Sequence, residues 1–262
     1  NTSLPTIDLP LKDNLLVWLD AGDDSAFSYS SGTEVSQWRD KSGNNNHASQ
    51  ATVAQQPSRS NVLNSRKTVN FVAANGDFIR IPSGIVFSNY FTAIVAIKPG
   101  TQSNAYAVVL DQDHSITGYQ GWVIQRNNTN SAWQTWVANS AANNWLNANQ
   151  VSYTDNTSQI VTLRKTSSAL TLFGNGTSSG DVSISDYALP QAGLYGLNIG
   201  YWRAGTSRYY NGEICEILVY NRNLSDTELK KVHTYLGIKW GILNTDRSII
   251  DVSGNSNNGL LG

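Results

Sequence analysis

The sequence predicts an all-β antiparallel sandwich with one short C-terminal amphipathic helix. Most apolar residues come in short runs bounded by Gly, Asn, Asp and Ser, as at Asn75–Asp77 and Gly174–Gly176, which is the pattern of strands joined by turns. Only one segment, Ser225–Trp240, repeats apolar residues at helical spacing. With 262 residues, the chain is long enough to bury a sizeable core in one such domain.

Each predicted strand is a short apolar run between turn signals. Phe91–Ile97 is apolar or small on both faces, so we expect a central strand that is covered on both sides. Ile160–Lys165 and Ala169–Phe173 form a predicted hairpin around Thr166–Ser168. In chain order, the other predicted strands are Leu15–Leu19, Thr68–Val72, Phe78–Ile81, Tyr106–Leu110, Trp122–Gln125, Trp133–Val137, Leu194–Tyr201 and Ile214–Tyr220.

The predicted helix has both a start and a stop signal. Ser225–Glu228 is a capping box, in which the Ser side chain accepts from the amide three residues on and the Glu side chain reaches back. Gly241 ends the segment. We expect the helix to lie against the sandwich, sealed by Tyr220 and Trp240, because one face carries the apolar residues Leu229, Val232, Leu236 and Trp240.

Composition excludes several classes of partner. The chain has 18 basic and 19 acidic residues, a formal net charge of −1 and no basic stripe, so we expect no nucleic-acid partner. No apolar run approaches the roughly 20 residues that span a bilayer, so we expect no membrane insertion. The one cysteine, Cys215, cannot form an internal disulfide and is interpreted as a small buried residue.

One loop motif occurs twice. Asp40–Ala48 and Asp251–Gly259 share the pattern D-x-S-G-N-x-N, whose short side chains can cap their own backbone amides. The second copy either opens a similar domain that is cut short or is a coincidental turn. We therefore predict an N-terminal extension over 1–13, one domain over 14–242 and a C-terminal tail over 243–262.

Both ends of the predicted domain resemble one known family. The segments that carry the likeness are Leu16–Ala21, Val35–Asn44, Val69–Phe71, Asn75–Phe78, Asn211–Ser225 and Tyr235–Gly241. Their order resembles the laminin-G-like domains of the concanavalin-A-like lectin/glucanase superfamily in bacterial and phage surface proteins. The resemblance implies a jelly-roll sandwich over roughly residues 14–242. It says little about function, because most of the matching residues are scaffold.

The sequence offers no convincing catalytic set. Glu213 and Glu216 are three apart, so on a regular strand they face opposite sides, which does not suit a pair of glycosidase carboxylates. Asp111 and Asp113 do share a face and precede His114, so a pair there stays open. We predict no catalytic residues, and keep a polysaccharide-degrading enzyme as an alternative.

Calcium is the cofactor that the resemblance implies. Laminin-G-like sandwiches hold it at a loop rim with carboxylate and amide oxygens, which suit a hard cation. The candidate ligands are Asp111, Asp113 and, secondarily, Asp77. The alternative is that these carboxylates are solvated or cap turns.

Aromatic residues are the candidates for partner binding. In the pairs Tyr201-Trp202 and Tyr209-Tyr210, neighbouring side chains on a strand point to opposite faces, so at least one of each pair should face outward. Outward aromatics suit either a sugar ring or a protein interface. The predicted binding residues are Tyr119, Trp133, Trp136, Trp145, Tyr201, Trp202, Arg203 and Tyr209.

These observations favour a non-catalytic, lectin-like or adhesion module that contacts glycans through its aromatic residues. We expect it on a viral or bacterial surface protein, and so at an extracellular, cell-surface or virion-surface location. The alternative is a structural virion or fibre subunit that uses the same aromatics to bind neighbouring subunits as a homo-oligomer. The third hypothesis is the polysaccharide-degrading enzyme.

Overall fold

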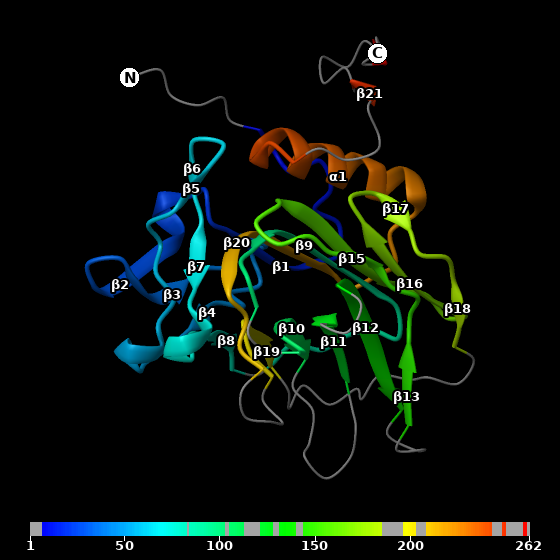
Figure 1. The fold of residues 1–262 in the computed structure, drawn as a ribbon. Coiled ribbons are helices and arrows are strands. Elements are labelled where there is room, and N and C mark those ends of the chain that lie inside the picture. The colour runs from blue at the N-terminus through cyan, green and yellow to red at the C-terminus, as the bar shows by residue number, and fades with distance from the viewer. Residues whose placement is uncertain are drawn as a thin grey trace.

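The computed structural model describes residues 7–82, 84–102, 105–112, 121–127, 131–139, 144–184, 196–202, 208–242, 248–249 and 259–260. These residues form two large antiparallel sheets packed face to face, with a helix on the outer side of one of them (Figure 1). None of the described helices is long and apolar enough to cross a membrane. The predicted all-β sandwich with one C-terminal α-helix is confirmed.

The first sheet has eight described strands, and β9 lies between β20 and β15 as the predicted central strand. Strand β7 extends β1 along the edge of β20, and β18 pairs with β16. The bounds are β1 (Leu15–Asp20), β20 (Gly212–Tyr220), β9 (Phe91–Pro99), β15 (Gln159–Lys165), β16 (Ala169–Gly174), β17 (Thr177–Ser178), β7 (Val69–Phe71) and β18 (Val182–Ser183).

The second sheet has ten described strands, in the order β13-β12-β11-β10-β19-β8-β4-β3-β2, with β14 paired to β12. The bounds are β13 (Asn144–Asn147), β12 (Ala132–Asn139), β11 (Gly121–Asn127), β10 (Val108–Gln112), β19 (Leu197–Ile199), β8 (Ile79–Ile81), β4 (Ala48–Ser49), β3 (Glu34–Trp38), β2 (Phe27–Ser31) and β14 (Val151–Ser152). The sequence did not predict β2–β4, β13 and β14, whose apolar content is low.

Smaller elements complete the described structure. Two hairpins pair β5 (Val62–Leu63) with β6 (Arg66–Lys67) and β21 (Ser248–Ile249) with β22 (Gly259–Leu260). Three 3₁₀ helices cover Asp24–Ala26, Val53–Gln55 and Ala73–Asn75.

Large rings fill the space between the two sheets. Trp122 on β11 stacks against Phe91 on β9, with 5.0 Å between ring centroids, so the two sheets share one core. Trp38 on β3 is fully buried and stacks on Phe27 at 5.5 Å. Burying such rings supplies much of the stabilisation of a sandwich.

Helix α1 (Asp226–Trp240) begins and ends where the sequence predicts. Ser225 accepts from the amide of Glu228, and the Glu228 carboxylate accepts from the Ser225 amide at 2.8 Å. Gly241 follows with φ +65°, a left-handed conformation that favours glycine. Tyr220 and Trp240 are fully buried between helix and sheet.

A β-bulge at Cys215 overturns one prediction. Ile214 pairs with Ile97 of β9 but Glu216 pairs with Ala96, so Cys215 is an extra residue in β20. Glu213 pairs with Lys98, which shares a face with Ala96. The expectation that Glu213 and Glu216 face opposite sides is therefore wrong, because a bulge resets the alternation.

The first copy of the repeated loop covers the outer edge of β1. Asp40 accepts from the amides of Ser42 and Asn46, each at 2.9 Å, as the motif predicts. It also accepts from the amide of Trp18 at 2.8 Å. Asn46 and Asn44 donate to carbonyls of Leu16 and Leu15, each at 2.8 Å. Side chains thus satisfy edge groups that would otherwise attract another strand.

The second copy, Asp251–Gly259, lies outside the described residues except for its last residue. The proposed domain bounds and the truncated-repeat interpretation therefore stay predictions.

Candidate functional site

One row of side chains crosses the outer face of the ten-stranded sheet. Cross-strand pairing aligns residues of five neighbouring strands, β12, β11, β10, β19 and β8. We call this set the sheet row, and it consists of Trp136, Val123, Asp111, Asn198 and Arg80.

The apolar neighbours of these residues show which way the row faces. Leu197 and Ile199 flank Asn198 and belong to the core, as do Ile79 and Ile81 on either side of Arg80. Because successive side chains on a strand alternate between faces, Asn198 and Arg80 point away from the core. The row therefore places polar groups on the face of the sheet opposite the core between the two sheets, where Asp111 and Asn198 are nevertheless fully buried.

Asp111 and Asn198 form the polar centre of the row. The Asn198 amide Nδ2 donates to the Asp111 carboxylate at 3.1 Å, and both residues are buried. The side-chain oxygens of Asn198 and of Gln125, which pairs with Val108, are also buried and accept no hydrogen bond from any described residue. Such oxygens are costly to leave without a donor, so this face favours a ligand that donates hydrogen bonds.

Two guanidinium groups lie in the electrostatic reach of this centre. Burial raises the pKa of Tyr201. The positive charge of Arg80 lowers this pKa and the negative charge of Asp111 raises it, so both charges act on the Tyr201 hydroxyl. Burial lowers the pKa of Arg208, whereas the negative charge of Asp111 raises it. Arg80 and Arg208 therefore add positive charge to the surroundings of Asp111.

Aromatic rings adjoin the polar centre. Tyr201 packs on Phe78 with ring centroids 4.2 Å apart and on Tyr209 at 6.1 Å. The Arg208 guanidinium lies 3.8 Å from the centroid of the Trp202 ring, which favours a cation–π contact.

A small apolar cluster on this face involves another of these rings. Trp202 is half-buried and packs against Val108, Val123 and Trp136, and this cluster is separate from the main core. Trp136 is 7% exposed, so Trp202 is the more accessible of the two tryptophans.

The structure brings together only some of the predicted binding residues. Trp136 belongs to the sheet row and Trp202 packs against it. Tyr209 stacks on Tyr201. Asp111, a predicted calcium ligand, also belongs to the row. The side chain of Trp145 on β13 lies outside the described residues, as do Tyr119, Arg203 and Asp113.

Trp133 belongs to the core and not to the binding face. It is fully buried, its indole donates to Gln159 at 3.1 Å, and it meets Tyr153 edge to face. Trp133 and Trp136 are three residues apart on β12, so they face opposite sides of the strand. The predicted binding role of Trp133 is therefore corrected.

The sequence prediction missed Arg80, Asn198 and Arg208. For two of them a signal exists, because Arg80 interrupts Ile79–Ile81 and Asn198 interrupts Leu197–Ile199. A single polar residue inside an apolar strand indicates an outward position. Arg208 carries no such local signal.

The predicted calcium site stays a prediction, because its candidate ligand Asp113 lies outside the described residues. Asp77 accepts from the Val72 amide at 2.8 Å, and burial raises its pKa to about 6, which fits the turn-capping alternative. Asp111 is committed to the Asn198 amide. In the described part of the chain, no three His, Cys, Asp or Glu residues come together as a metal site.

Comparisons with known proteins agree with this architecture. A family model described as the concanavalin A-like lectin/glucanases superfamily matches residues 73–230. A comparison with curated protein sequences finds no match.

Solved structures share the fold at low sequence identity. Domain 4 of AbnA, an extracellular arabinanase from Geobacillus stearothermophilus in complex with arabinotriose, has TM-score 0.60 and 13% identity, covering 84% of this chain and 98% of that chain. The binding domain of Paraclostridial mosquitocidal protein 1 has TM-score 0.61 and 17% identity, covering 90% and 57%. Trypanosoma rangeli sialidase in complex with sialic acid has TM-score 0.57 and 13% identity, covering 90% and 35%.

Proposed function

The chain belongs to the concanavalin A-like lectin/glucanases superfamily, and we propose that it is a non-catalytic carbohydrate-binding module. The binding surface that we propose is the outer face of the ten-stranded sheet around Asp111, Asn198, Trp202 and Tyr201. The observation that carries this proposal is the sheet row, which sets polar groups beside half-buried aromatic rings.

The chemistry of this face suits a sugar. A sugar hydroxyl both donates and accepts, so it can give its proton to the oxygens of Asn198 and Gln125 and accept from a guanidinium such as Arg208. The apolar face of a pyranose can lie on an aromatic ring such as Trp202. The arabinotriose complex of the similar arabinanase domain supports the same ligand class.

The absence of a second carboxylate in the row supports a binding role over catalysis. Glycoside hydrolysis needs two carboxyl groups that flank the scissile bond. The residues paired beside Asp111 are Val123 and Asn198, and neither carries a charge. We also propose that the module works outside the cytoplasm on a viral or bacterial surface protein.

The test is glycan binding by Trp202→Ala, which removes the more accessible of the two tryptophans described on this face. We expect the wild-type chain to be retarded in affinity electrophoresis by at least one polysaccharide of a panel, and the variant to bind about tenfold or more weakly. The matched control is Tyr90→Ala, because Tyr90 is 44% exposed and precedes β9 in the other sheet.

Three results would contradict the proposal. One is the absence of binding to any glycan by the wild-type chain, and another is equal loss of affinity in the two variants. The third is release of reducing ends or unsaturated products from a polysaccharide, which would favour the enzyme alternative.

Self-assembly is the second candidate, favoured by the apolar cluster of Val108, Val123, Trp136 and Trp202. Aromatic side chains are enriched at interfaces between subunits. Sedimentation velocity over a range of concentrations separates the two functions. A concentration-dependent oligomer that Trp202→Ala abolishes would favour a structural subunit.

Calcium binding at Asp111 stays a prediction with its own test. Isothermal titration with CaCl₂ should show heat that Asp111→Asn abolishes, because the variant lacks the charge that a hard cation requires. An unchanged titration in the variant would contradict a site at this residue.

A further inference from the structure

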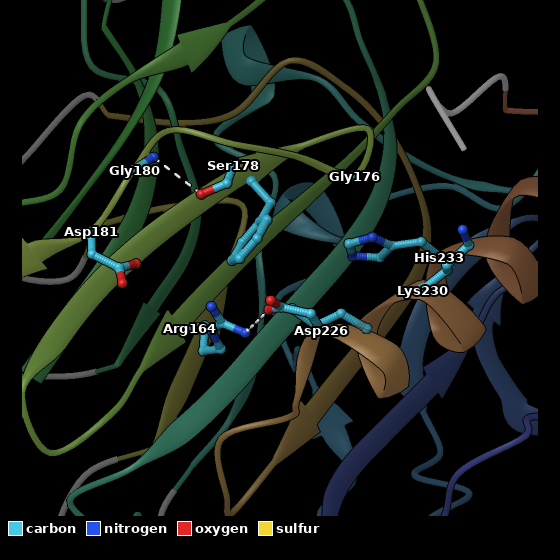
Figure 2. A pocket seen from close by; sticks show the side chains of 10 residues that line it. Arg164, Gly176, Ser178, Gly180, Asp181, Asp226, Lys230 and His233 are labelled. Carbon is cyan, nitrogen blue, oxygen red and sulfur yellow. Dashed lines mark hydrogen bonds and ion pairs between the residues drawn. The ribbon is translucent and has the colours of Figure 1, made fainter. Parts of the chain in front are cut away.

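A pocket lies on the other side of the sandwich from the sheet row, between helix α1 and the hairpin strands β15, β16 and β17 (Figure 2). Its volume is about 490 Å³, within the range of small-molecule sites. It does not include any residue of the sheet row. The lining residues that matter here are Arg164, Phe173, Ser178, Asp181, Asp226 and Lys230.

Arg164 forms the floor of this pocket. Its guanidinium lies 4.9 Å from the centroid of Phe173, and its Nη1 donates to Asp226 at 2.5 Å and to the carbonyl of Leu224 at 3.2 Å. Its Nε is buried and has no acceptor among the described residues. A guanidinium has its N–H donors in a fixed plane, and the contacts with Phe173, Asp226 and Leu224 fix the orientation of that plane.

His233 helps to fix the helix side of the pocket. It is almost fully buried, and its Nε2 lies 2.8 Å from the hydroxyl of Thr162 on β15. Together with the Arg164–Asp226 pair, this contact ties helix α1 to the neighbouring strand. The helix wall is therefore formed before any ligand arrives.

The hairpin side presents exposed polar groups. Asp181 is exposed, and its carboxylate accepts from the Thr171 hydroxyl. Ser178 is also exposed and accepts from the amide of Gly180 at 3.1 Å. Figure 2 shows Asp181 and Asp226 on opposite sides of Arg164. Carboxylate acceptors therefore lie on both sides of the Arg164 guanidinium, which is the donor.

The formal charges of the lining balance. Arg164 and Lys230 carry two positive charges, and Asp181 and Asp226 carry two negative charges. A ligand with a net charge would meet a repelling partner for each attracting one, whereas a hydroxyl can donate to a carboxylate and accept from a cation. From this geometry we infer that the pocket binds a neutral polyhydroxylated ligand, such as a mono- or disaccharide unit.

This site is separate from the proposed glycan-binding face, and it does not depend on that proposal. Helix α1 covers the eight-stranded sheet, whereas the sheet row lies on the ten-stranded sheet. If both sites bind sugars, one module can contact two glycan segments, which raises its avidity for a branched or dense surface.

The test is a titration of ¹⁵N-labelled Trp202→Ala protein with neutral mono- and disaccharides of pentoses and hexoses. This background weakens the proposed face and leaves the pocket intact. We expect millimolar binding with amide shifts at Ser178, Gly180 and Asp181. We expect Asp181→Ala to weaken binding about tenfold, and Ser178→Trp to block it by filling the pocket while all four charges remain.

The control variant is Asp13→Ala, which removes an exposed carboxylate outside the pocket and should leave the titration unchanged. Amide spectra of each variant establish that it is folded. Shifts that cluster elsewhere, or no shifts with any sugar at about 100 mM, would overturn the inference. Tighter binding of glucuronate than of glucose would overturn the assignment of a neutral ligand.

Discussion

Each sheet carries a buried carboxylate on its outer face, and the surroundings of the two carboxylates differ. Glu216, under helix α1, accepts from the indoles of Trp18 and Trp240 at 2.7 and 2.8 Å and from the hydroxyl of Tyr235 at 2.8 Å. Lys239 adds an ion pair at 2.8 Å. Asp111, on the ten-stranded sheet, has the amide of Asn198 as its hydrogen-bond donor and lies near oxygens that lack donors among the described residues.

The difference separates the structural role of Glu216 from the binding role that we propose for Asp111. The donors around Glu216 come from β1 and from the helix, so the carboxylate joins three elements of the fold. Near Asp111, the side-chain oxygens of Asn198 and Gln125 accept no hydrogen bond from any described residue, and the ligand that we propose would donate to them. Burial of a charge therefore indicates function only when its surroundings are incompletely paired.

The largest effect that we predict is the loss of stability in Glu216→Ala. The variant leaves two buried indole N–H groups and a buried ammonium without this acceptor. The free energy of unfolding should therefore be about 3–5 kcal/mol lower than in wild type. Chemical denaturation measures the change. The control is Glu213→Ala on the same face, whose partners are Thr68 and Lys98. A larger loss in the control would refute the network interpretation.

The second prediction concerns Asp111→Asn, which keeps an acceptor for Asn198 and removes the charge near Arg208. We expect a change in unfolding free energy within about 1 kcal/mol, but glycan affinity lower by about tenfold or more. Calorimetric titration and denaturation of the same sample provide both values. If Asp111→Asn lowers the free energy of unfolding as much as Glu216→Ala does, the two carboxylates do not differ in role.

The smallest effect concerns the exposed cap of helix α1. Hydrogen bonds from Arg222 and Ser225 lower the pKa of Glu228 to about 2. A lowered native pKa means that the carboxylate contributes stability above about pH 4.5, and this contribution is lost as pH falls toward 2. Because both side chains of the Arg222–Glu228 pair are partly exposed to solvent, we expect Glu228→Gln to lower the free energy of unfolding by only about 0.5–1 kcal/mol at pH 7.

The free energies of unfolding of wild type and Glu228→Gln, measured from pH 7 to pH 2, should become equal at the acid end. A difference that stays constant across this range would mean that the charge of Glu228 does not contribute.

The sequence predicted the local elements well and the site only in part. The capping box at Ser225 and the glycine at 241 act within a few residues, so the helix ends could be predicted from the sequence. The sheet row depends on register between strands that are distant in sequence, such as β8 and β19. No pattern within one strand indicates that Arg80 lies beside Asn198.

One error was avoidable, whereas the bulge at Cys215 and the role of Arg208 could not be predicted. Strict alternation along β12 would have separated Trp133 from Trp136, because three residues apart means opposite faces. The bulge at Cys215 has no evident signal in the surrounding residues Ile214–Ile217, which read as one regular strand. Arg208 reaches Trp202 through tertiary packing, which periodicity does not encode.

Cys215 is the extra residue of the bulge in β20. If it paired as a regular strand residue, alternation would turn Glu216 toward the core between the sheets and away from the indoles of Trp18 and Trp240. Deleting Cys215 would instead leave Ile214 and Glu216 as neighbours opposite Ile97 and Ala96, so Glu216 would keep its side of the sheet. The irregular pairing at this one position therefore determines that Glu216 faces helix α1.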